Sequence, residues 1–129
     1  MNKKFIPHEE ALAFEELGFD EPCFAKYEKD GLFQLFHTIE IAAYLTINSN
    51  GVNGIVCAPL YQQAFRWFRE RHNLFGVVDI KHTIMFYKIE DINEKLIAFD
   101  APPFKSHEEA ELECLKQLIK IVTKEWLKK

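Results

Sequence analysis

The order of hydrophobic and polar positions along this chain predicts three helices. The first covers residues 7–17, because Pro7 suits the first helical position and Gly18 is a typical left-handed stop after a last turn. The second runs from Pro59 to about His72, where helical periodicity places apolar side chains on one side and polar side chains on the other.

The third predicted helix begins after Ser106. This serine has capping-box spacing to Glu109, so that its hydroxyl can accept a hydrogen bond at the helix start while Glu109 reaches back. Apolar side chains then recur on one stripe of the helix: Leu112, Leu115, Leu118, Ile119, Val122 and Trp126.

Alternating apolar positions and turn residues predict two β-hairpins. The first covers residues 22–36 around an Asp-Gly turn, a dipeptide that favours the positive φ of tight hairpins. The second pairs residues 81–90 with residues 95–100. Residues 37–58 contain an alternating segment that favours a third strand but also tolerates a short helix, and both interpretations stay open.

These elements predict a single two-layer α+β domain over residues 1–129. Hairpins imply an antiparallel sheet, here built from two hairpins with four to five strands, and about three one-sided helices imply a sheet face that they cover. A chain of 129 residues is long enough to bury such a core without metal or disulfide bonds.

Composition and charge narrow the classes of partner. The chain has 16 basic and 20 acidic residues and a net charge of −4, which argues against a dedicated nucleic-acid binder. No window approaches the roughly 20 apolar residues of a membrane-spanning helix. The three cysteines fit no zinc or redox spacing, and no apolar signal segment follows Met1, so we expect reduced thiols in a cytoplasmic protein.

Phenylalanine is unusually frequent, with 12 residues. Seven of them fall in the predicted hairpins or on the apolar side of the second helix, so we expect them to fill the core between helices and sheet. They are Phe24, Phe33, Phe36, Phe65, Phe68, Phe86 and Phe99.

The second helix carries every arginine of the chain: Arg66, Arg69 and Arg71. Gln62, Arg66 and Arg69 share its polar side, and a guanidinium group binds carboxylate or phosphate in a planar fork that lysine lacks. Trp67 beside them would suit stacking on a base or ring. The alternative interpretation is a solvated helix face with an Arg66–Glu70 ion pair.

Charge is nearly absent just before this helix, since residues 31–65 contain one charged residue, Glu40. Buried central strands explain such a stretch, and a neutral surface for a partner or a second copy is the alternative. A homodimer is therefore compatible with the sequence.

Motifs for catalysis or metal binding are missing from the sequence. The five histidines show no HExxH spacing, and the five glycines form no phosphate-binding loop. Cys57 precedes a helix start, where a thiolate is stabilised, but no neighbouring histidine supports it, so a buried structural thiol is favoured. We expect no catalytic residue, no metal and no cofactor.

Three segments carry a resemblance to a known family: residues 16–24 (ELGFDEPCF), 58–70 (APLYQQAFRWFRE) and 108–115 (EEAELECL). They are similar to short uncharacterised proteins of phages and prophages of Bacteroidota-type bacteria. The resemblance implies a phage-derived cytoplasmic accessory protein and assigns no activity to any residue.

Two functions follow as expectations. The first is a non-enzymatic protein-binding module that meets a protein partner or a second copy through Gln62, Arg66, Trp67 and Arg69. The second is a small-ligand or nucleotide-binding protein, with or without weak hydrolase activity, in which the arginine-bearing helix holds an anion.

Overall fold

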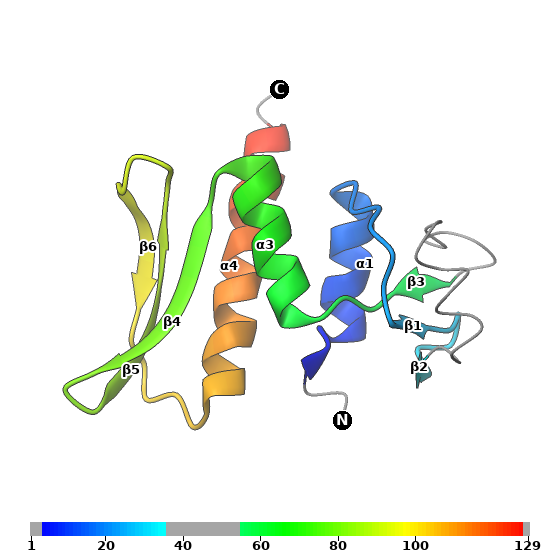
Figure 1. Ribbon diagram of the computed structural model, residues 1–129, viewed down its shortest axis with the longest axis horizontal. Coiled ribbons are helices and arrows are strands. Elements are labelled where there is room, and N and C mark those ends of the chain that lie inside the picture. Colours follow the sequence, from blue (N-terminus) through cyan, green and yellow to red (C-terminus); the bar gives the residue numbers. More distant parts are fainter. Residues whose placement is uncertain (1–3, 36–54, 128–129) are drawn as a thin grey trace. The chain divides into compact units, whose positions relative to one another are not determined.

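The computed structural model describes residues 4–35 and 55–127, and the chain divides into two compact units, Met1–Tyr61 and Gln62–Lys129 (Figure 1). The described residues form three helices and six strands, and the strands pair in two separate three-stranded antiparallel sheets. The α+β class is therefore confirmed. The expected single sheet of four to five strands is wrong in detail, because the two hairpins belong to different sheets.

The first unit contains α1 (His8–Glu16) and a sheet of strand order β2–β1–β3. β1 (Ala25–Tyr27) pairs with β2 (Phe33–Leu35) across the predicted Asp-Gly turn, which confirms the first hairpin. β3 (Val56–Cys57) pairs with the other edge of β1. The segment at 37–58 whose strand or helix character the sequence leaves open lies outside the described residues, except for its last part, which includes β3.

The hydrogen bonds at the end of α1 explain why the sequence predicts that this helix ends at Gly18. Gly18 has a φ of 94° and donates a hydrogen bond from its N–H to the Glu15 carbonyl at 3.1 Å, while the Phe19 N–H donates to the Phe14 carbonyl at 3.0 Å. The rings of Phe14 and Phe19 meet edge-on at 5.2 Å. This pair of hydrogen bonds with an apolar contact is the Schellman motif, which needs a left-handed residue after the helix.

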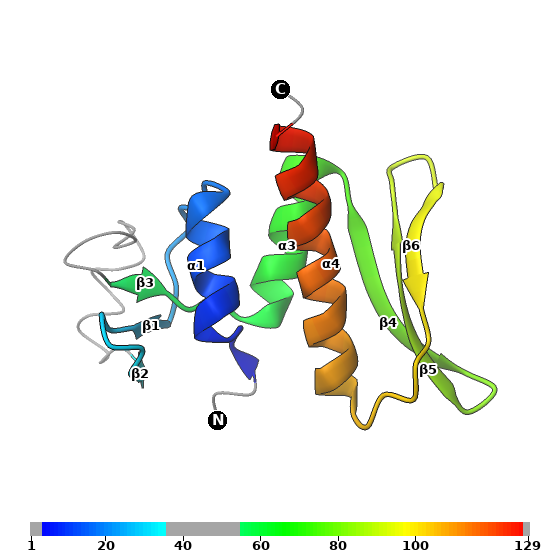
Figure 2. The ribbon, with the colours of Figure 1, turned by 180° about the vertical axis from the view of Figure 1, so that it is seen from behind.

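The second unit consists of two helices and a sheet of strand order β4–β5–β6. α3 (Tyr61–His72) is followed by β4 (Phe75–Lys81), β5 (Ile84–Glu90), β6 (Leu96–Asp100) and α4 (His107–Leu127). α4 packs on β4 and β5, and Figure 2 shows it running along one side of the sheet. The hairpin predicted at 81–100 is confirmed as β5–β6.

β4 was not predicted from the sequence. It joins β5 through a two-residue turn at His82 and Thr83, which adopt positive φ values of 54° and 65°. Glycine or asparagine usually occupies such positions, since left-handed backbone is costly for other residues. Because neither glycine nor asparagine occupies these two positions, the sequence does not predict this turn.

The start of α4 agrees with the capping-box spacing. The Glu109 N–H donates to Ser106 Oγ at 3.1 Å, and the Glu109 carboxylate accepts from the Lys105 N–H at 3.3 Å. The Glu109 side chain therefore reaches back to the N–H of Lys105, the residue before Ser106. On the apolar stripe Leu115, Leu118 and Val122 are fully buried.

The phenylalanines do not all fill the core. Phe65 and Phe68 are buried as expected, but Phe24 is 47% exposed and Phe99 is 56% exposed. In the β4–β5–β6 sheet the side toward α4 buries Tyr87 and Ile89, so alternation places Phe99 on the opposite side.

None of the helices in the described ranges combines the length and hydropathy that a membrane crossing requires.

Candidate ligand-binding site

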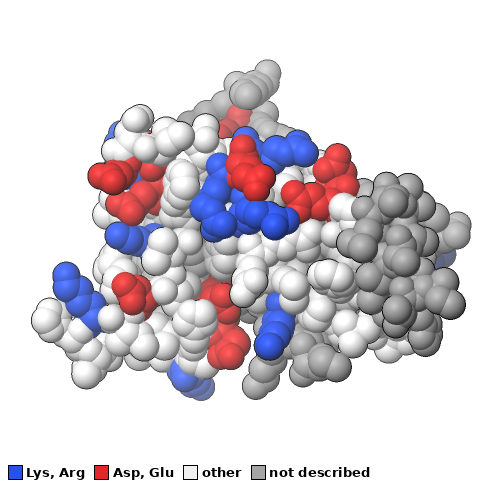
Figure 3. All heavy atoms as spheres, in the orientation of Figure 1, with Lys and Arg blue, Asp and Glu red and all other residues white. Residues whose placement is uncertain are grey.

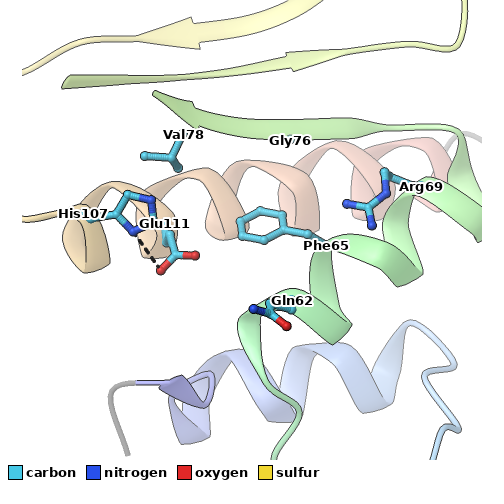
Figure 4. A pocket seen from close by; sticks show the side chains of 7 residues that line it. All are labelled: Gln62, Phe65, Arg69, Gly76, Val78, His107 and Glu111. Carbon is cyan, nitrogen blue, oxygen red and sulfur yellow. Dashed lines mark ion pairs between the residues drawn. The ribbon is translucent and has the colours of Figure 1, made fainter. Parts of the chain in front are cut away.

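A pocket of about 430 Å³ lies within the second unit, between α3, β4 and the start of α4 (Figure 4). Each of these elements contributes a short set of side chains. The lining residues are Gln62, Phe65 and Arg69 from α3, Gly76 and Val78 from β4, and His107 and Glu111 from α4.

Helical spacing explains which α3 residues reach the pocket. Gln62, Phe65 and Arg69 are separated by three and four positions, so they follow one stripe of the helix. Arg66 is one position beyond Phe65, about 100° further around the axis. It lies outside the pocket lining and its Nε is 3.5 Å from Glu70 Oε1, both side chains being exposed.

On β4 the pocket depends on a missing side chain. Gly76 and Val78 are two positions apart and share the sheet face toward α4. A Cβ atom at Gly76 would lie 3.1 Å from both Cys114 Sγ and Leu118 Cδ1 and 3.2 Å from Phe65 Cδ1. Glycine therefore allows β4 to approach α4 closely at the pocket wall.

α4 contributes a paired acid and imidazole. His107 Nδ1 lies 3.3 Å from Glu111 Oε1, one turn along the helix. Burial raises the pKa of the Glu111 carboxyl above its ordinary value and the nearby Glu108 adds to this, while His107 acts in the opposite direction. Glu111 is thus a carboxyl group that is costly to ionise and that depends on its imidazole neighbour.

The two polar ends of the pocket are separated by an aromatic ring. Figure 4 shows the Arg69 guanidinium at one end, the His107–Glu111 pair at the other and the Phe65 ring between them. Within the described part of the chain no carboxylate forms an ion pair with Arg69. Its guanidinium can therefore donate in a bidentate fashion to a carboxylate or phosphate that enters the pocket.

The four residues predicted from sequence separate into three groups. Gln62 and Arg69 line the pocket, whereas Arg66 lies beside it on the exposed helix surface. Trp67 is only 2% exposed, and its ring packs 5.2 Å from Phe68 and 5.0 Å from His72. Burial on the apolar side of α3 therefore leaves this ring unable to stack on a ligand held by the arginines.

Basic side chains gather over α3 on the face shown in Figure 3. Arg66, Arg69 and Arg71 are all exposed. Acidic side chains lie among them in the same view, and one of the three arginines, Arg66, is paired with Glu70.

Five pocket residues were not identified from the sequence. The i,i+4 spacing of His107 and Glu111 on a predicted helix was readable, but their approach to Arg69 depends on tertiary packing. Gly76 and Val78 could not be placed because β4 was not predicted, and Phe65 resembled an ordinary core residue.

No group of three or more histidine, cysteine, aspartate or glutamate side chains that could hold a metal occurs among residues 4–35 and 55–127. Comparison of the chain with protein-family models, with curated proteins and with solved structures finds no match.

Proposed function

We propose that the second unit binds a small molecule bearing a carboxylate or phosphate group in the pocket between α3, β4 and α4. The observation that carries the proposal is the exposed Arg69 guanidinium, which lines the pocket while the neighbouring Arg66 is paired with Glu70. A guanidinium beside an apolar ring is a typical anion-recognition arrangement, since the fork fixes the anion and the ring accepts the ligand body.

The other end of the pocket favours a ligand with a second polar group. Glu111 can accept a hydrogen bond from a hydroxyl or amine, and His107 orients this carboxylate from 3.3 Å. A volume of about 430 Å³ suits a metabolite-sized molecule or a nucleotide fragment. The ligand class is therefore an anion with an apolar or aromatic body and a distal hydrogen-bonding group.

The proposal assigns binding and no reaction. Cys114, the thiol behind the Gly76 wall, is fully buried, and burial with the nearby Glu111 raises its pKa to about 12. A thiol with this pKa stays protonated at neutral pH and does not act as a nucleophile.

The test uses thermal shift measurements with inorganic phosphate, succinate and adenosine monophosphate as probes. We expect at least one of them to raise the melting temperature, and the shift should decrease with added salt because the contact is ionic. Arg69→Ala should weaken this binding by about tenfold or more, since it removes a charge-assisted hydrogen-bond donor pair.

Arg66→Ala is the matched control, because it removes the same side chain from the same helix outside the pocket. It should retain most of the shift. Equal losses in both variants would assign the effect to the general charge of α3 and contradict the proposed site. Absence of any shift with all three probes contradicts the proposal as well.

A further inference from the structure

β4 lies at the edge of its sheet, and its open side borders the candidate pocket. In the strand order β4–β5–β6, β5 is the one neighbour of β4 among the strands that the structure describes. Gly76 and Val78 of β4 line the pocket (Figure 4). Because glycine has no side chain, the backbone of β4 itself forms part of the pocket wall.

The hairpin register shows which backbone groups of β4 face the open side. The turn between β4 and β5 has two residues, so the pair that closes it, Lys81 and Ile84, exchanges hydrogen bonds, and every second pair along the ladder does the same. Gly76 and Val78 belong to the alternate pairs. Their N–H and C=O groups therefore point away from β5, toward the open side.

The backbone of Ile80 supports this assignment. Ile80 belongs to the same alternate set, and its N–H donates to the Asp79 carboxylate at 2.8 Å. Within residues 4–35 and 55–127 the N–H groups of Gly76 and Val78 have no such acceptor. An open row of N–H and C=O groups is a template for pairing with another extended chain.

The two ends of the pocket complement the two charged ends of a short peptide. Figure 4 shows Val78 near the His107–Glu111 pair and Arg69 at the opposite end, toward the start of β4. Arg69 can hold a terminal carboxylate, and the Glu111 carboxylate can accept a hydrogen bond from a terminal amine. A peptide held in this way runs antiparallel to β4, which is the more stable direction of strand pairing.

The spacing of the open backbone groups indicates the length of the peptide. Gly76 and Val78 are two strand repeats apart, roughly 6.7 Å, which is also the distance between the first and third Cα atoms of an extended tripeptide. The pocket volume of about 430 Å³ suits a ligand of this size. Side chains of an extended chain alternate between two sides, and one of these sides would face Phe65, which favours an apolar side chain there.

We infer that the ligand of this pocket is a short peptide of about three residues with free termini, which adds to the open edge of β4 as an antiparallel strand. The inference rests on the proposed function, because the anion held by Arg69 is then the terminal carboxylate of the peptide. Gly76 and Val78 bind the peptide backbone, Glu111 binds the amine, and Phe65 contacts an apolar side chain.

The first experiment offers the protein three mixtures of tripeptides of varied sequence: one with both termini free, one with C-terminal amides and one with acetylated amines. Affinity selection read by mass spectrometry should recover peptides with an apolar residue from the first mixture and few from the other two. The strongest peptide then becomes the probe. Arg69→Ala should weaken its binding by about tenfold or more, whereas Arg66→Ala, outside the pocket, should retain it.

A proline substitution tests the pairing with β4. Val78→Pro removes an N–H from the open side and leaves the ladder to β5 intact, and proline is tolerated at such edge positions. It should weaken binding of the selected peptide by about tenfold or more, while Val78→Ala, which keeps the N–H, should have a smaller effect. Ile80→Pro is the matched control, because it removes an N–H of the same alternate set outside this pocket.

Two further measurements need no substitution in the protein. N-methylation of the selected peptide at the amides that face β4 should weaken its binding, since it removes the same hydrogen bonds from the ligand. Binding of the unmethylated peptide should slow amide hydrogen exchange at Gly76 and Val78, measured by NMR. Val77 and Asp79 should change less, because their N–H groups already pair with β5.

Each of four results would overturn the inference: equal recovery from all three mixtures, no recovery from any, equal losses with Val78→Pro and Ile80→Pro in variants whose circular dichroism is unchanged, or unchanged exchange at Gly76 with peptide bound. The proposed function fails separately. If phosphate, succinate or adenosine monophosphate binds through Arg69 and no peptide does, the inference alone is wrong. If neither the anions nor the peptides bind, both are wrong.

Discussion

His107 Nδ1 lies 3.3 Å from Glu111 Oε1, and this contact joins the first two turns of α4 at the wall of the candidate pocket. The imidazole is more than half exposed, whereas the carboxylate is only 20% exposed. Glu111 is therefore the more desolvated of the two groups, and burial raises the pKa of its carboxyl although His107 acts to lower it.

The raised pKa of Glu111 has a defined effect on stability. The folded state holds the proton more tightly than the unfolded state, so the contribution of this group is most favourable below the unfolded pKa of about 4 and is lost as the pH rises through the higher folded pKa. Glu111→Gln should therefore gain stability relative to the unsubstituted protein as the pH rises from acidic to neutral. Thermal melts at several pH values measure this difference.

The control for that prediction is Glu113→Gln. Glu113 lies on the same helix, is 44% exposed and forms an ion pair with Lys116 at 3.6 Å. Its substitution should give a stability difference that changes little over the same pH range, since exposed pairs contribute weakly. A parallel pH dependence in both variants would show that burial of Glu111 is not the cause.

Cys114 should be unreactive in the folded protein. Its side chain is fully buried, and burial raises the pKa of the thiol to about 12, with Glu111 adding to the shift. A variant with Cys23→Ser and Cys57→Ser leaves this thiol as the sole one, and it should react with a disulfide reagent at mildly alkaline pH only after denaturant is added. Rapid labelling without denaturant would contradict the burial of α4 against β4.

Gly76 should tolerate no branched side chain. Valine there would place its Cβ 3.1 Å from Cys114 Sγ and would add two methyl groups near Phe65 and Leu118. We expect Gly76→Val to lower the free energy of unfolding by about 1–3 kcal/mol through overpacking. Chemical denaturation measures the loss, and Cys114→Ala in the same chain should recover part of it because it removes one of the atoms that clash.

Ser106 should stabilise the start of α4 through its hydroxyl. Ser106→Ala removes the acceptor of the Glu109 N–H, a hydrogen bond of 3.1 Å, and should lower the free energy of unfolding by about 1 kcal/mol. Ser106→Asp keeps an acceptor at the same position and favours the positive end of the helix dipole, so it should retain stability. Equal losses in the two variants would show that the cap contributes nothing.

Local signals in the sequence determined the helices and two of the hairpins. Gly18 ends α1 because only a left-handed residue completes its last hydrogen bonds, and Ser106 begins α4 because a side-chain acceptor satisfies a free N–H there. The turn between β1 and β2 could likewise be predicted from sequence, because the Asp-Gly dipeptide favours the positive φ of a tight hairpin. Each of these features depends on residues a few positions apart, so the local sequence is sufficient to predict it.

Only the tertiary structure decided which residues line the candidate pocket and which face of the β4–β5–β6 sheet is covered. Arg69 and Glu111 are 42 residues apart in sequence, and they meet at one pocket only because α3 and α4 pack on β4, a strand whose turn at His82 and Thr83 carries no sequence signal. The sequence likewise predicted Phe99 as a core residue because it falls in a predicted hairpin, but alternation along a strand defines two faces without saying which one is covered. Helix packing makes that choice, and here it buries Ile89 and leaves Phe99 exposed.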